Sequence, residues 1–212
     1  MEHQIAQVIG NLIGTTTQTE TLVRYTNITS KLEEYFEFQT LGDPKLQTML
    51  RETANFCAAM RDKKKPPFWW LSFVGNSGNG KTHLAKQIAK YFHRIARFYE
   101  HPETTATCVH SGQFYDWREV TSKLKEGGWG LLNQICEDWF CVIDDIGAEY
   151  DPSGAMAGAL DRVLNSRKEK WTVLTSNLLM GDVQGLDVRI ASRLLRGGNR
   201  VVNATAMDFC LR

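Results

Sequence analysis

Short apolar runs alternate with amphipathic stretches from Phe68 onward, and this pattern predicts alternating strands and helices. The expected strands are residues 68–74, 106–110, 139–143, 171–175 and 200–204. The expected helices of the same region are residues 81–99, 113–125, 131–136, 151–168 and 183–195. Because such alternation is typical of a parallel sheet with helices on both faces, the fold class is expected to be α/β.

The N-terminal part of the chain shows a different pattern. Residues 1–42 have no strong periodicity, and we expect an arm or a small partner-binding module there. A helix is expected to begin at Asp43-Pro44, since aspartate can cap a helix and proline suits its first turn. It is expected to end within residues 61–67, where a charge run is followed by two prolines. We therefore expect one domain over residues 43–212.

The composition is that of an ordinary globular protein and argues against several classes of protein. The 212 residues carry 25 basic and 24 acidic side chains, so a nucleic acid would have to bind at a local patch. No apolar run is as long as a membrane span, and the N-terminus lacks the basic region of a secretory signal. The five cysteines have no CxxC spacing, which favours a reducing compartment over a disulfide framework or a zinc ribbon. We expect a cytoplasmic protein with no membrane partner.

Between the first expected strand and its helix lies GNSGNGKT, which fits the phosphate-binding pattern GxxxxGK[ST]. Its glycines permit positive φ angles, so successive N–H groups can turn toward a phosphate at the start of the next helix. Lys81 is expected to reach the terminal phosphates, and the Thr82 hydroxyl is expected to bind Mg²⁺. His83 follows on the helix, where it can contact the nucleotide, pack or face solvent. The candidate nucleotide-binding residues are Gly75, Asn76, Ser77, Gly78, Asn79, Gly80, Lys81, Thr82 and His83.

Polar side chains follow the two apolar strands at 139–143 and 171–175. Asp144 is the expected Mg²⁺ partner, and Asp145 is placed to orient or deprotonate an attacking water. Glu149 is a rival candidate for the base. The alternative to metal binding and catalysis is that Asp144 and Asp145 are solvated and simply begin a turn. Asn177 could bind the γ-phosphate or the water, because ligands bind at the carboxyl ends of strands in open α/β sheets.

An arginine-rich helix is expected near the end of the sequence. Arg189, Arg193 and Arg196 are spaced so that they share one helical face. They could supply an arginine finger to a neighbouring nucleotide site, a patch for the DNA backbone, or a solvated face.

Four blocks of this sequence together resemble the AAA+ ATPases of the DnaC/IstB group, which includes bacterial and phage helicase loaders and transposition helper ATPases. The blocks are GNSGNGKTHLA (75–85), CVIDDIG (141–147), VLTSNL (173–178) and RIASRLL (189–195). The resemblance implies a three-layer αβα sandwich, a P-loop NTPase with a five-stranded parallel core sheet and no C-terminal helical lid. It also implies ATP and Mg²⁺ as cofactors and a homo-oligomer with shared active sites.

The resemblance also implies roles for single residues. Asn177 stands where the group has sensor 1, and Arg193 stands where it has the finger that acts on a neighbour, with Arg189 as a second candidate. Many relatives have glutamate at the position of Asp145. Because aspartate is shorter, we expect slow ATP hydrolysis that DNA or a partner stimulates.

The leading functional hypothesis is an ATP-dependent loader of a replicative DNA helicase that binds single-stranded DNA. In this hypothesis Tyr25, Tyr35, Phe36 and Phe38 grip the helicase. One alternative is an IstB-like helper that assembles on duplex DNA and recruits a transposase. A further alternative is an ATP-binding switch with little hydrolysis. A small-molecule kinase is disfavoured, because it needs an arginine-bearing lid that acts within the same chain.

Overall fold

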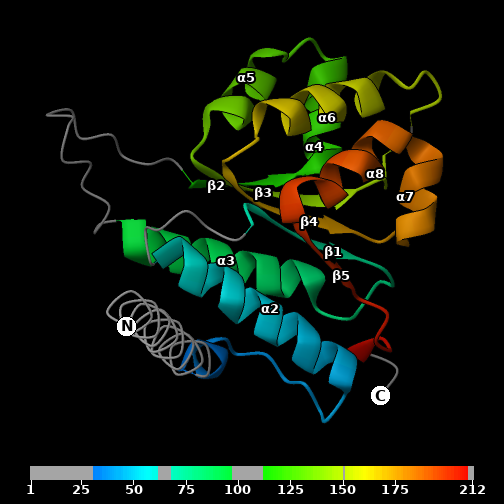
Figure 1. Ribbon diagram of the computed structural model, residues 1–212. Coiled ribbons are helices and arrows are strands. Elements are labelled where there is room, and N and C mark those ends of the chain that lie inside the picture. Colours follow the sequence, from blue (N-terminus) through cyan, green and yellow to red (C-terminus); the bar gives the residue numbers. More distant parts are fainter. Residues whose placement is uncertain (1–30, 62–67, 97–111, 150, 210–212) are drawn as a thin grey trace, which may run out of the picture.

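The computed structural model describes residues 31–61, 68–96, 112–149 and 151–209 (Figure 1). In this part of the chain a single parallel sheet has the strand order β2-β3-β4-β1-β5. The strands are β1 (Trp70–Val74), β2 (Gly112–Asp116), β3 (Phe140–Ile146), β4 (Trp171–Ser176) and β5 (Arg200–Asn203). The sheet confirms the predicted α/β class and the five-stranded parallel core.

Helices cover both faces of the sheet (Figure 1). One face carries α2 (Pro44–Arg61) and α3 (Lys81–Ala96). The other face carries α4 (Trp117–Lys125), α5 (Gly130–Glu137), α6 (Ala155–Ser166), α7 (Met180–Leu186) and α8 (Val188–Leu195). These layers confirm the three-layer αβα sandwich.

Side chains that alternate along the strands supply two apolar cores, one beneath each helical layer. In β3, Phe140 and Val142 belong to the core beneath α2 and α3, whereas Cys141 and Ile143 belong to the core beneath the other helices. Burial on both faces explains why this strand is a continuous apolar run in the sequence. Because all neighbouring strands are parallel, their carboxyl ends lie at one edge of the sheet.

Residues 112–116 form a strand where the start of a helix was predicted. The predicted helix over 113–125 is wrong at its start, because β2 occupies that stretch and α4 follows it. Tyr115 is buried within β2, and pairing with β3 decides the conformation. Asp116 then caps α4 by accepting a hydrogen bond from the backbone N–H of Arg118 at 2.9 Å. The predicted strand over 106–110 lies outside the described residues.

The predicted helix over 183–195 is two helices. Between α7 and α8, Asp187 has an extended backbone, and its carboxylate accepts a hydrogen bond from the N–H of Arg189 at 2.8 Å. This cap begins a new helix, which the apolar spacing alone did not reveal. Similarly, α6 begins at Ala155 and not at Asp151, whose carboxylate accepts hydrogen bonds from two N–H groups of its first turn.

The described residues before α2 pack against the domain. Phe36 is 3% exposed and lies with Leu32 in the core beneath α2 and α3. The ring of Tyr35 packs edge-on against Tyr91 of α3, with 5.6 Å between the ring centroids. The expectation that Phe36 grips a helicase is therefore wrong for this structure, since its ring is already buried. Tyr25 lies outside the described residues.

The segment after β5, residues 204–208, contains no helix, so the described part of this segment provides no helical lid. Thr205 of this segment accepts a hydrogen bond through its carbonyl from Lys45 Nζ at the start of α2, at 3.2 Å. None of the described helices combines the length and the apolar character that crossing a membrane requires.

Candidate nucleotide-binding site

The loop between β1 and α3 has the backbone shape of a phosphate-binding loop. Gly75, Gly78 and Gly80 have φ angles of +136°, +71° and +88°. These values lie in the region that glycine adopts readily and other residues rarely do. A Cβ at Gly75 would also overlap the carbonyl oxygen of Ala204. The sequence therefore needs glycine here for both conformation and space.

Lys81, the first residue of α3, folds back over this loop. Its Nζ donates hydrogen bonds to the carbonyl of Gly75 at 3.0 Å, to the carbonyl of Asn76 and to Asn79 Oδ1 at 3.3 Å. Lys81 is 5% exposed. Burial lowers the pKa of Lys81 to about 8, and the charges of nearby Asp145 and Asp144 oppose this shift. The loop thus concentrates one positive charge where a phosphate would lie.

The residues predicted to bind Mg²⁺ lie next to one another. The Thr82 hydroxyl donates a hydrogen bond to Asp144 Oδ1 at 3.0 Å, and the Thr175 hydroxyl donates to the same oxygen at 2.5 Å. Burial raises the pKa of Asp144, and these two hydrogen bonds oppose the shift. A hydroxyl at the start of the P-loop helix and a carboxylate of the neighbouring strand β3 fit Mg²⁺, whose other ligands would be phosphate oxygens and waters. Thr175 is a residue that sequence reasoning missed at this position.

Asp145 lies between two partners at the end of β3. Its φ angle is +59°, and the pairing of β3 with β4 is irregular at this residue. The Asp145 side chain therefore does not follow the alternating directions of side chains in a regular strand. Asn177 Nδ2 donates a hydrogen bond to Asp145 Oδ1 at 2.6 Å, so the structure brings these two predicted residues together. Arg118 Nε forms an ion pair with Asp145 Oδ2 at 3.2 Å.

Sequence reasoning missed Arg118 because it assigned the wrong structure to the residues just before it. In the structure Arg118 is the second residue of α4, directly after β2, and β2 is the neighbour of β3. Asp145 is the main cause that raises the pKa of the Arg118 guanidinium. Correct placement of β2 would have put this arginine at the carboxyl edge of the sheet.

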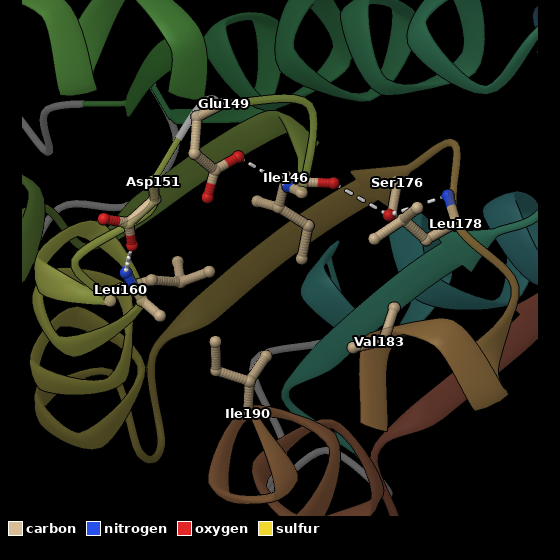
Figure 2. A pocket seen from close by; sticks show the side chains of 11 residues that line it. Ile146, Glu149, Asp151, Leu160, Ser176, Leu178, Val183 and Ile190 are labelled. Atoms are coloured by element: carbon tan, nitrogen blue, oxygen red, sulfur yellow. Dashed lines mark hydrogen bonds between the residues drawn. The ribbon is translucent and has the colours of Figure 1, made fainter. Parts of the chain in front are cut away.

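Glu149, the rival base, is held within the loop after β3. Its carboxylate accepts hydrogen bonds from the N–H of Gly147 at 2.7 Å and from Trp117 Nε1 at 3.0 Å. Figure 2 shows Glu149 at the side of a cavity of about 190 Å³ whose walls include Ile146 and Ile190. Both bonds come from residues near the end of β3 or the start of α4, so Glu149 fastens the loop after β3 to α4.

His83 points toward the segment before α2. Its Nε2 lies 3.0 Å from the carbonyl oxygen of Glu37, and its ring stacks on Phe38 with 6.3 Å between centroids. Its described contacts are therefore with these two residues and with Gln87 Nε2 at 3.5 Å.

The arginines of α8 have partners within the same chain. Arg193 Nε donates to Asp161 Oδ1 at 2.6 Å, and Arg193 Nη1 donates to Asn165 Oδ1 at 2.8 Å. Arg189 pairs with Asp187 at 2.7 Å, yet its side chain is 61% exposed. The predicted shared helical face does not include Arg196, which follows the end of α8 in a short 3₁₀ turn. Arg193 is therefore bonded to two side chains of α6.

Solved structures of replication proteins have the same fold. A DnaC helicase loader has a TM-score of 0.57 and 19% identity, over 85% of this chain and 98% of the other. DnaI has a TM-score of 0.57 and 21% identity, over 79% and 86%. The chain has the fold of these helicase loaders.

A third structure, the replication initiator DnaA bound to AMPPCP and single-stranded DNA, has a TM-score of 0.53 and 17% identity. The match covers 72% of this chain but 45% of the DnaA chain. Neither protein-family models nor curated protein sequences give a match.

Proposed function

We propose that this chain is an ATPase that loads a replicative DNA helicase. The single observation that carries the proposal is the meeting of Lys81, Thr82 and Asp144 at the carboxyl edge of a sheet that has the helicase-loader fold. This is the set of side chains that a P-loop NTPase needs for a Mg²⁺–nucleotide.

In the proposed reaction the loop N–H groups and Lys81 bind the phosphates of ATP. Thr82 and Asp144 hold Mg²⁺, which would neutralise charge on the phosphate oxygens. Asp145 orients the attacking water, and Asn177 keeps the Asp145 carboxylate in place through its 2.6 Å hydrogen bond. Arg118 occupies the other oxygen of Asp145 at 3.2 Å, so its departure would free that oxygen for the water. This restraint supports slow hydrolysis in the absence of a partner.

Oligomer formation and DNA binding are further parts of the proposal. A DnaA structure with a related fold holds both AMPPCP and single-stranded DNA, which supports single-stranded DNA as the ligand to test. We further propose that Arg193, or the more exposed Arg189, acts on the nucleotide of a neighbouring copy. We also propose that residues 1–42 bind the helicase, through side chains other than the buried Phe36.

The test is fluorescence anisotropy of labelled single-stranded and duplex DNA at low salt, with ATP, with ADP and without nucleotide. ATP-dependent binding that prefers single strands is expected. The matched control is Lys81→Ala, which should lose the effect of ATP while remaining folded. ATP hydrolysis is measured in the same samples.

The other outcomes separate the alternatives. A preference for duplex DNA would favour the transposition helper, and ATP binding without hydrolysis under any condition would favour a switch. Absence of ATP binding to the wild type would contradict the proposal as a whole.

A further inference from the structure

The segment after β5 lies on the phosphate-binding loop and is bonded to it at several points. The N–H of Ala204 donates to the carbonyl of Val74 at 2.7 Å, and the N–H of Phe209 donates to the carbonyl of Gly78 at 2.9 Å. The Asn79 side chain also donates to the carbonyl of Ala204. These contacts join the end of β1 and the loop itself to a segment more than 120 residues later in the chain.

Asp208 places a carboxylate directly against this loop. A Cβ added to Gly78 would overlap the Asp208 carboxyl group, so the carboxylate fills the space beside the bare backbone of that glycine. Gly78 belongs to the same loop as Lys81, so a phosphate bound by this loop would have the same sign of charge as a carboxylate that lies on the loop backbone. The two anions would therefore repel each other.

Aromatic rings hold the residue that follows Asp208. Phe209 packs edge-on against Phe38, with 5.9 Å between the ring centroids, and Phe38 in turn stacks on His83. A Cβ at Gly80 would lie 2.6 Å from the Phe38 ring and 3.3 Å from the Phe209 ring. The rings thus fit against the third glycine of the loop, and the Phe209 N–H bond anchors the residue next to Asp208.

We propose that Asp208 sets the nucleotide affinity of this site by opposing the phosphates, and that nucleotide binding loosens the Ala204–Phe209 segment from the loop. The proposal rests on the proposed nucleotide binding at Lys81. Because coupling between two binding events is reciprocal, a docked segment that weakens nucleotide binding by some factor must itself be weakened in its docking by the same factor when nucleotide binds. The segment is then docked on the loop in the nucleotide-free protein and loosened in the nucleotide-bound protein.

The first experiment measures ADP binding by isothermal titration calorimetry in the presence of Mg²⁺. Asp208→Asn keeps the shape of the side chain and removes its charge, and it should bind ADP about tenfold more tightly than the wild type. Glu126→Gln is the matched control, because it makes the same change of charge at the exposed end of α4. It should bind ADP as the wild type does. Added salt should narrow the difference between Asp208→Asn and the wild type.

The second experiment needs no variant. Amide hydrogen exchange of the wild type is measured for residues 204–209 with and without ADP. Faster exchange of the Phe209 amide with ADP, beside slower exchange of the Lys81 region, is expected. Slower or unchanged exchange at Phe209 would overturn the inference.

The binding data separate failure of this inference from failure of the proposed function. If all three proteins bind ADP and Asp208→Asn is equal to or weaker than the wild type, Asp208 does not oppose the nucleotide. If none of them binds ADP, the proposed nucleotide site is itself wrong, and the inference falls with it. Binding by Asp208→Asn alone would support a segment that fully blocks the wild-type site.

Discussion

Lys81 supplies the positive charge of the phosphate-binding loop, and its burial makes that charge depend on pH. Its pKa is lowered to about 8, so the side chain is protonated at neutral pH and loses its proton at moderately alkaline pH. A bound phosphate favours the protonated form. Nucleotide binding above pH 8 therefore requires uptake of a proton, whereas binding below pH 8 does not.

We expect the affinity for ADP to be constant from pH 7 to about 8 and then to fall by up to about tenfold per pH unit. Calorimetry across pH 7–9.5 checks this. The control is Lys81→Arg, whose guanidinium stays protonated throughout, so its affinity should not change with pH. A wild-type affinity that is flat to pH 9.5 would contradict the lowered pKa.

Arg118 is expected to restrain Asp145 in the protein without its partners. Arg118→Ala removes the 3.2 Å ion pair while Asn177 still holds the carboxylate, so basal ATP hydrolysis should rise about three- to tenfold. Lys123→Ala, also exposed on α4, is the control and should leave the rate unchanged.

The companion variant is Asp145→Asn, which keeps ADP binding but should lower hydrolysis at least about a hundredfold. Steady-state phosphate release measures both variants. An unchanged rate in Asp145→Asn would remove Asp145 as the base, and a fall in the Arg118→Ala rate would assign Arg118 an active role.

At the scale of elements, a single buried arginine joins three of them. Arg167, directly after α6, is fully buried, and its Nη1 donates to the carbonyls of Ile135 at 2.7 Å and Asp138 at 2.8 Å. Its Nη2 donates to the carbonyl of Trp171 at 2.8 Å, and its Nε donates to the Thr172 hydroxyl at 2.9 Å. The residue thus ties the ends of α5 and α6 to the start of β4.

Arg167→Leu should lower the free energy of unfolding by about 3 kcal/mol, because several buried carbonyls would lose their donor. Urea unfolding followed by circular dichroism measures the change. The neighbouring Lys168→Leu is exposed and serves as the control, with a change of about 0.5 kcal/mol or less. Equal stability of the two variants would show that water replaces the lost bonds.

The elements that were predicted correctly have strong local signals, and those that were not are decided by pairing or capping. The run over 139–143 is apolar enough to be a strand wherever it lies. By contrast, GQFYD in β2 is weakly apolar, and its place beside β3 gives it strand structure. Asp187 separates α7 from α8 by a cap that the apolar spacing does not record.

At the scale of the whole molecule, the residues before α2 contribute to the main core. Phe36→Ala should lower the free energy of unfolding by about 3–4 kcal/mol, because the ring is 3% exposed. Leu41→Ala, at a side chain that is 59% exposed, is the control and should change it little. Thermal unfolding measures both, and equal melting temperatures would show that the buried Phe36 ring does not stabilise the domain.

The proposal that neighbouring copies share an active site is tested by mixing subunits. Lys81→Ala and Arg193→Ala should each be inactive, and an equimolar mixture should regain about a quarter of wild-type hydrolysis if each site uses one residue from each of two copies. Arg189→Ala is tested in the same way. Because Arg193 also pairs with Asp161 at 2.6 Å, the stability of Arg193→Ala is measured alongside. No recovery in either mixture would contradict an arginine that acts on a neighbour.

The sequence by itself determined the fold class, the glycine-rich loop and the pair of acids near the end of the third strand. Each of these features depends on residues that are adjacent in the sequence. The loop has glycines that allow positive φ, followed by a lysine and a threonine at a helix start, and the strand is an apolar run that ends in carboxylates. Local conformation and burial follow from such patterns without knowledge of the partners.

Only the tertiary structure decided which side chains meet at the site. Arg118 reaches Asp145 because β2 pairs with β3, and Asp208 reaches Gly78 because β5 pairs with β1 and returns the chain to the loop. Strand order is set by how the two apolar cores pack, not by local preference. Contacts between residues distant in sequence, which hold the acids and the loop in place, therefore follow from packing.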